Sequence, residues 1–279
     1  MLNEFKREID YCTYCPKLCR FSCPVSNAEF RETVTPTGKM SFLYLLRQGT
    51  VQLNQEVGSV FYKCAECLRC YHYCEHKIET PPALRAGREI VLKEGVCPPG
   101  IMELGSNFEQ RGSPFKEDLL KKFRDILPQK YFVSEAQAVY FPGCSAINYF
   151  PENITDTFTV LEKAGVDYVS AYGEEKLCCG WPLNCLGDSE GFKRIAEENY
   201  KSLRRYRLII SGCPACVYAL KVKYAELGLT LKKVVHISEF LRGLIEEKRL
   251  VLKPKVEDAI IYHDPCFLGR YLEVYNEPR

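Results

Sequence analysis

The stretch Leu177-Cys178-Cys179-Gly180-Trp181-Pro182 decides the fold of the second half of this 279-residue chain. It holds two adjacent cysteines, and other cysteines lie at equal distances on either side. Cys144 lies 34 positions before the first of the pair, and Cys213 lies 34 positions after the second. Cys213 also opens a C-x-x-C that ends at Cys216. This regular spacing indicates one shared site rather than scattered core cysteines.

Short apolar runs lead into each of these cysteine groups, at residues 139–141, 166–172 and 208–210. Helical patterns begin between the runs, at Pro151 and Ser189. Alternating strands and helices predict βαβ units and a parallel sheet, whose strand ends meet at one edge. Five thiols that converge there have enough ligands for an iron–sulfur cluster and more than one zinc ion needs. A vicinal disulfide, or a four-cysteine zinc site with a spare thiol, stays open as an alternative.

Eight further cysteines form two runs in the N-terminal quarter, Cys12-x2-Cys15-x3-Cys19-x3-Cys23 and Cys64-x2-Cys67-x2-Cys70-x3-Cys74. The second has the bacterial ferredoxin spacing, although Glu75 replaces the usual proline, and the first has one extra residue in its middle gap. The fourth cysteine of such a run typically ligates the other cluster. We therefore predict one [4Fe-4S] cubane on Cys12, Cys15, Cys19 and Cys74, and another on Cys64, Cys67, Cys70 and Cys23. Two zinc ribbons are the alternative, but zinc sites more often use separate C-x-x-C pairs.

The motifs of the second half resemble those of a known family. They are Tyr140-Phe-Pro-Gly-Cys144, Cys178-Cys179-Gly180-x-Pro182 with Gly187-Asp188, and Cys213-Pro-x-Cys216. They are similar to the cysteine-rich CCG domain of the heterodisulfide reductase catalytic subunit and related iron–sulfur subunits, and the N-terminal quarter looks like an α-helical two-cluster ferredoxin. The resemblance implies a non-cubane [4Fe-4S] cluster on Cys144, Cys178, Cys179, Cys213 and Cys216, with zinc as the alternative there.

The predicted fold class is α+β. We expect an α-helical two-cluster ferredoxin domain at 1–97, a linker with a short helix at 98–138, a CCG domain at 139–254 and the start of a truncated second CCG repeat at 255–279. Loop signals lie at Thr35-Pro36-Thr37-Gly38, Pro98-Pro99-Gly100 and Gly105-Ser106-Asn107. After the strand predicted at 234–237, Ser238 is the expected helix cap, and His236 is expected to pack or cap.

The C-terminal segment repeats the opening of the first CCG unit. The apolar run from Asp258 predicts a strand that leads to Pro265 and Cys266, with Phe267 where the family usually has histidine. We expect an exposed apolar edge near Ile260 and Ile261 that a partner covers. The roles of Cys97, Cys185 and Cys266 stay undecided.

Composition narrows the class of protein. The formal net charge is +2 and there is no long basic run, which argues against nucleic acid as the main partner. No stretch reads as a signal peptide or as a membrane span, so we expect a cytoplasmic chain that reaches a membrane complex only through a partner. Disulfides are a poor explanation for 16 cysteines in that compartment.

The function follows from the expected clusters. No G-x-G-x-x-G or G-x-x-x-x-G-K loop is present, so hydride or nucleotide chemistry would belong to a partner. The first hypothesis is an oxidoreductase subunit whose cubanes pass single electrons to the CCG cluster, where a thiol or disulfide reacts. The second is a pure relay between a flavoprotein dehydrogenase and a quinone or other carrier, and the third keeps a structural zinc at the CCG site. A flavoprotein, a cytochrome or a second CCG-bearing chain is the expected partner, and the CCG cysteines are the only catalytic candidates.

Overall fold

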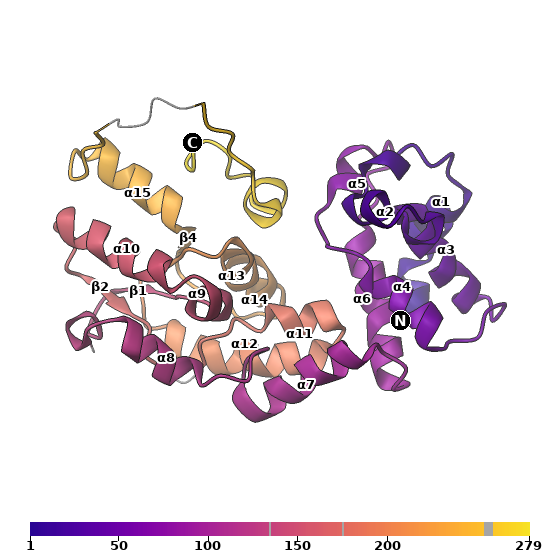
Figure 1. Cartoon of the computed structure of the whole chain (residues 1–279), viewed down its shortest axis with the longest axis horizontal. Helices are drawn as coiled ribbons and strands as arrows, with labels where there is room; N and C mark the ends of the chain where they lie inside the picture. Colours follow the sequence, from indigo (N-terminus) through magenta and orange to yellow (C-terminus); the bar gives the residue numbers. More distant parts are fainter. Residues whose placement is uncertain (134, 175, 254–258) are drawn as a thin grey trace. The chain divides into compact units, whose positions relative to one another are not determined.

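The computed structural model describes residues 1–133, 135–174, 176–253 and 259–279. It divides into two compact units (Figure 1). The first consists of Met1–Gly105 together with Pro182–Ser189, and the second of Ser106–Trp181 and Glu190–Arg279. In the described residues the first unit is helical and the second contains a parallel sheet, which confirms the predicted α+β class.

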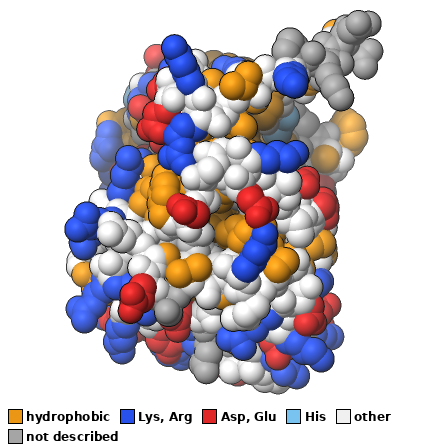
Figure 2. Space-filling model, turned by 90° about the vertical axis from the view of Figure 1, so that its left-hand side faces the viewer, with side chains coloured by type: hydrophobic (Ala, Val, Ile, Leu, Met, Phe, Trp, Pro, Cys, Tyr) orange, Lys and Arg blue, Asp and Glu red, His pale blue; other side chains and the backbone are white. Residues whose placement is uncertain are grey.

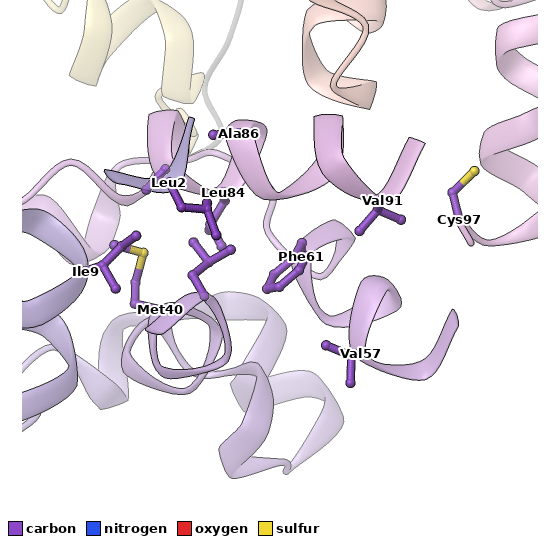
Figure 3. Close-up of a cluster of buried hydrophobic side chains, with 11 residues drawn as sticks. Leu2, Ile9, Met40, Val57, Phe61, Leu84, Ala86, Val91 and Cys97 are labelled. Carbon is purple, nitrogen blue, oxygen red and sulfur yellow. The ribbon is translucent and has the colours of Figure 1, made fainter. Parts of the chain in front are cut away.

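Short helices build the first unit around one apolar core. Buried side chains from four of the helices meet in this core, among them Ile9, Met40, Phe61 and Leu84 (Figure 3). The helices are α1 (Lys6–Tyr14), α2 (Pro24–Glu29), α3 (Pro36–Arg47), α4 (Gln55–Tyr62), α5 (Arg69–His72) and α6 (Thr80–Lys93), and α7 (Pro99–Arg111) runs from this unit into the second. The cysteine runs lie in the segments between these helices and at their ends.

The three predicted loops lie in or at the start of helices. Thr35 caps α3, because its side chain accepts a hydrogen bond from the backbone N–H of Gly38, and Pro36 is the first helical residue. Helix α7 begins at Pro99 and continues through Gly105. Proline at a helix start lacks only an N–H that would have no partner there, so these prolines open helices rather than loops.

The second unit is organised by a four-stranded parallel sheet. Its strands are β1 (Ala138–Tyr140), β2 (Val169–Ala171), β3 (Leu208–Ser211) and β4 (Val234–His236), in the order β2-β1-β3-β4. The central strand β1 pairs Val139 with Ser170 on one side and with Ile209 on the other. Since all four strands run in one direction, the loops after β1, β2 and β3 lie at the same edge.

Helices cover both sides of this sheet. Figure 1 shows α10 and α15 on one side and α12 on the other, and α8 packs against α9 and α10. Their bounds, with those of the remaining helices, are α8 (Leu119–Ile126), α9 (Cys144–Tyr149), α10 (Pro151–Lys163), α11 (Trp181–Leu186), α12 (Ser189–Leu203), α13 (Pro214–Tyr218), α14 (Tyr224–Glu226) and α15 (Ile237–Glu246). His236 rather than Ser238 caps α15, because the His236 ring accepts from the Ser238 N–H and the Glu239 carboxylate accepts from the His236 N–H.

The C-terminal segment differs from its prediction. Asp258 lies outside the described residues, and residues 259–265 form no strand. A strand needs a neighbour to pair with, and none of the described strands pairs with these residues. Ile260 and Ile261 are nevertheless 72% and 96% exposed. Beyond them a π-helical turn at Phe267–Tyr271 places the Phe267 ring against that of Tyr218.

The surface of the second unit is mixed in character. Figure 2 shows positively and negatively charged side chains scattered over the face that it displays, with small groups of hydrophobic side chains between them. In the described part of the chain, no helix has the length and apolar character that crossing a lipid bilayer requires.

Candidate iron–sulfur sites

The first thiol group consists of Cys12, Cys15, Cys19 and Cys74. Burial raises the pKa of the Cys12 thiol, and the neighbouring thiols of Cys19 and Cys74 raise it further. Burial likewise raises the pKa of Cys19 to about 11, with contributions from the charges of Cys70, Cys15 and Cys74. These four side chains, which come from both cysteine runs, are therefore close enough to influence one another. All four are half-buried.

The second thiol group consists of Cys23, Cys64, Cys67 and Cys70, and all four line one cavity. The other lining side chains are mostly apolar: Pro24, Val25, Pro36, Lys39, Ala65, Leu68, Thr80, Pro81 and Leu84. Burial raises the pKa of Cys70 to about 11, and the charges of Cys64, Cys67 and Cys23 add to this effect. Cys23, from the first run, thus lies beside three cysteines of the second run.

The backbone of the second run adopts left-handed conformations at two non-glycine residues, Glu66 with φ of 51° and Leu68 with φ of 55°. Such residues are uncommon and persist only where the surroundings hold them. Here the buried Glu66 carboxylate accepts hydrogen bonds from Arg85 at 2.6 Å and from Arg88 at 2.7 Å. The hydrogen bonds of Glu66 therefore hold the turn that carries Cys64 and Cys67.

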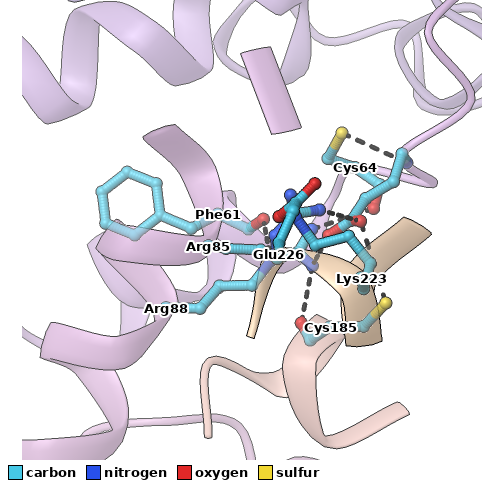
Figure 4. Close-up of polar contacts among 8 residues, drawn as sticks. Phe61, Cys64, Arg85, Arg88, Cys185, Lys223 and Glu226 are labelled. Atoms are coloured by element: carbon cyan, nitrogen blue, oxygen red, sulfur yellow. Dashed lines mark hydrogen bonds and ion pairs between the residues drawn. The ribbon is translucent and has the colours of Figure 1, made fainter. Parts of the chain in front are cut away.

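Arg88, on α6, joins this turn to the rest of the first unit (Figure 4). Its guanidinium donates to the carbonyl oxygens of Phe61 at 2.9 Å and Cys64 at 3.0 Å. It also donates to the carbonyl of Cys185 at 2.6 Å. Cys185 belongs to the segment Pro182–Ser189, which follows the paired cysteines in the sequence but packs as part of the first unit. Arg88 and Glu66 are each 3% exposed, so the ion pair between them is buried.

The third site lies in the second unit, where five thiols lie next to one another. The Cys178 thiol contacts Cys144 and Cys179, and the Cys216 thiol contacts Cys179 and Cys213. These contacts raise the pKa of Cys178 and Cys216. They lower the pKa of Cys179 and Cys213. We call these five the CCG thiols.

The parallel sheet brings the CCG thiols together. Cys144 begins α9 after β1, the adjacent pair follows β2, and Cys213 precedes α13 after β3. Gly143 has φ of +77°, and a Cβ atom there would lie 2.9 Å from the Cys216 sulfur. Only glycine combines this conformation with such a close approach. The glycine before Cys144 therefore lets the first loop close onto the third.

Two side chains that the sequence did not single out hold the paired cysteines. Asn199 on α12 donates to the Cys178 carbonyl at 2.8 Å and to the Tyr224 hydroxyl at 3.0 Å. Tyr224 in turn donates to the Cys179 carbonyl at 3.0 Å. Both side chains are at least 99% buried. An asparagine and a tyrosine at helix positions carry no sequence signal for this role, because it depends on how α12 and α14 meet.

The three undecided cysteines lie elsewhere. Cys97 is part of the apolar core of the first unit. The Cys185 sulfur lies 3.8 Å from a carboxylate oxygen of Glu66, and burial raises the pKa of its thiol. The Cys266 sulfur lies 3.3 Å from a guanidinium nitrogen of Arg270. His236, whose ring also contacts the Gly212 carbonyl at 3.1 Å, serves as a helix cap.

The donor sets fit iron–sulfur clusters. All three groups here consist of thiols, the ligands that [4Fe-4S] clusters use.

Comparisons with known proteins agree with this chemistry. Residues 8–78 match the family model of the 4Fe-4S dicluster domain, and residues 138–221 match that of the cysteine-rich (CCG) domain. No solved structure shows a significant match.

Several curated proteins are similar to the chain. Two of them are subunits of dihydromethanophenazine:CoB–CoM heterodisulfide reductase. The one from Methanosarcina mazei is 28% identical, over 98% of this chain and 72% of that protein. The one from Methanosarcina barkeri is 30% identical over 77% of the chain, which spans 54% of that relative.

A third relative belongs to another kind of redox system. The EtfAB:quinone oxidoreductase of Syntrophomonas wolfei is 28% identical over 80% of the chain, which spans 33% of it. The chain is thus an iron–sulfur electron-transfer protein that combines a 4Fe-4S dicluster domain with a CCG domain and is homologous to the heterodisulfide reductase chains of Methanosarcina.

Proposed function

We propose that the chain carries two cubane [4Fe-4S] clusters and one non-cubane [4Fe-4S] cluster, and that it performs thiol/disulfide redox chemistry at the last. The first thiol group would hold one cubane, the second thiol group the other, and the CCG thiols the non-cubane cluster. The observation that carries this proposal is the group of five neighbouring, mostly buried thiols at one edge of the parallel sheet. Single electrons would pass from the cubanes to this site.

Thiol/disulfide chemistry at this site requires that two single electrons be brought together. A disulfide takes up two electrons and two protons when it becomes two thiols, whereas a cubane passes electrons singly. A cluster held by the CCG thiols would supply an iron site for sulfur and one-electron redox capacity. The chain's own residues position it: Asn199 and Tyr224 fix the carbonyls of the paired cysteines, and Gly143 admits the third loop.

The second candidate function is a pure relay, without substrate chemistry at the CCG site. It is favoured by the similarity to a protein named EtfAB:quinone oxidoreductase. In this role the chain would connect a flavoprotein dehydrogenase with a quinone or another carrier. Either function requires further redox subunits, such as a flavoprotein, a cytochrome or a second CCG-bearing chain, and several relatives are themselves named as subunits. We place both functions in the cytoplasm, with any membrane association through such a partner.

Electron paramagnetic resonance distinguishes the two functions. The oxidised, anaerobically purified chain is mixed with a thiol such as 2-mercaptoethanesulfonate, and the spectrum is recorded before and after. We expect a new paramagnetic signal that Cys178→Ser abolishes and that Cys97→Ser, a change at a buried cysteine outside the sites, retains. An unaltered spectrum in a chain with all three clusters would favour the relay. Stoichiometric zinc, with iron near eight atoms rather than twelve, would overturn the cluster at the CCG site.

A further inference from the structure

A buried lysine lies beside the second thiol group. Lys39, in the first turn of α3, is 1% exposed. Its ammonium nitrogen lies 3.6 Å from the Cys23 sulfur, and the side chain lines the same cavity as the four thiols. A lysine is rarely buried so fully unless a negative group offsets its charge.

The structure shows no carboxylate in that role. Among the described residues, no aspartate or glutamate lies within ion-pair distance of the Lys39 ammonium. The group that does accept a hydrogen bond from this ammonium is the Cys23 thiol, 3.6 Å away. The negative partner of Lys39 is therefore the thiol group itself, or what it binds.

The first thiol group has a different electrostatic environment. Its four cysteines are half-buried, whereas the second group includes the buried Cys23, and the basic side chains next to the first group in sequence, Lys17, Arg20 and Lys77, are exposed. Arg20 also forms an ion pair with Glu32 at 2.6 Å. Solvent screens exposed charges, whereas a buried charge acts on its neighbours through a lower effective dielectric constant. One of the two sites thus has a buried cation, and the described surroundings of the other have exposed ones.

We propose that Lys39 is a positioning residue that raises the reduction potential of the cubane on the second thiol group above that of the cubane on the first. This inference rests on the proposed function. A cubane with four thiolate ligands is negatively charged and gains one more negative charge on reduction. A nearby ammonium that also donates a hydrogen bond to a ligand sulfur stabilises the reduced form more than the oxidised form. Burial of the second site works in the opposite direction, so Lys39 is the group that offsets it.

The consequence is a direction for electrons inside the first unit. An electron that arrives at the more exposed first cubane would move to the more buried second cubane, because the second has the higher potential. The second cubane is also the one whose ligand turn is tied through Arg88 to the segment Pro182–Ser189. Lys39 therefore makes the more buried cluster the acceptor of the pair.

The test is a redox titration followed by electron paramagnetic resonance, with the anaerobically purified full chain. We expect Lys39→Met to lower the midpoint potential of one cubane and to leave the other unchanged, and Lys39→Arg to restore most of the difference. Lys63→Met is the matched control, because Lys63 is exposed, adjoins Cys64 in sequence and pairs with Glu29 at 2.6 Å. Equal potentials in Lys39→Met and the unchanged chain would overturn the inference, as would an equal shift in Lys63→Met.

A second measurement does not depend on whether Lys39→Met folds. In the reduced chain with isotope-labelled lysine, pulsed resonance should detect a lysine nitrogen coupled to one cubane, and Lys39→Arg should remove that coupling. Its absence from the unchanged chain would contradict the inference. If the chain showed no cubane signals at all, the proposed function would fail first, so the two failures are distinct.

Discussion

The two units bring thiols together in different ways. In the first unit, two short runs of sequence supply eight cysteines, which nearby turns hold. In the second unit, three loops that are far apart in sequence supply five cysteines, and only the parallel sheet unites them. A local motif specifies the first kind of site, whereas a tertiary fold specifies the second. Substitutions far from the cysteines should therefore disrupt the second kind of site more readily than the first.

The largest expected effect is the loss of one cluster while the other two are retained. Cys178→Ser removes an inner member of the CCG thiols, so this variant should lose the iron of one cluster, about four atoms of about twelve, and keep both cubane signals. Iron analysis with resonance spectroscopy measures both. Cys97→Ser should keep all the iron. Loss of the cubane signals in Cys178→Ser would show that the units do not bind their clusters independently.

The next effect concerns the buried network of the first unit. Arg88→Met should lower the free energy of unfolding by about 3–5 kcal/mol, because it removes one of the two arginines that pair with the buried Glu66 carboxylate. Lys93→Met, on the same helix, breaks the exposed pair with Glu89 and should cost less than about 1 kcal/mol. Denaturant unfolding compares the two. Similar losses in both variants would contradict a special role for the buried network.

A smaller effect tests how closely the CCG loops approach. Gly143→Ala and Gly228→Ala both force alanine into a positive φ, and each should cost about 1–2 kcal/mol of stability. A Cβ atom at Gly228 meets no atom within 4 Å, whereas at Gly143 it lies 2.9 Å from the Cys216 sulfur. Only Gly143→Ala should therefore also reduce the iron content. Equal iron in the two variants would show that the loops need not approach so closely.

The smallest effect is a pH dependence in the second unit. Burial lowers the pKa of His236, so the unfolded chain binds its proton more readily than the folded chain does. The stability that this contributes is complete above the ordinary histidine pKa of about 6.5 and is lost as the pH falls through the lower folded value. His236→Asn keeps a capping side chain and should flatten the dependence of unfolding free energy on pH. His72→Asn, at an exposed position, should not, and an unchanged slope in His236→Asn would contradict the assignment.

Much of this architecture could be predicted from the sequence. The apolar runs before the cysteine groups are β1, β2 and β3, and the helices expected from Pro151 and Ser189 are α10 and α12. These predictions succeeded because period, proline and cysteine spacing all pointed to the same elements. The helical starts at Pro36 and Pro99 were missed, because a proline opens a helix or a loop with the same local signal.

The side chains that support the thiol groups could not be predicted from a single sequence. Asn199, Tyr224, Lys39 and Arg88 are ordinary helix residues until the helices pack. The strand expected after Asp258 failed for the same reason, since an apolar run becomes a strand only beside a partner. Cysteine spacing thus predicted the donor atoms, whereas the groups that hold and polarise them depend on tertiary contacts.

Quantification of iron and zinc in the anaerobically purified chain tests the central claim most directly. We expect about twelve iron atoms per chain, from three four-iron clusters, and no stoichiometric zinc. A chain that is folded, colourless and free of iron would contradict it.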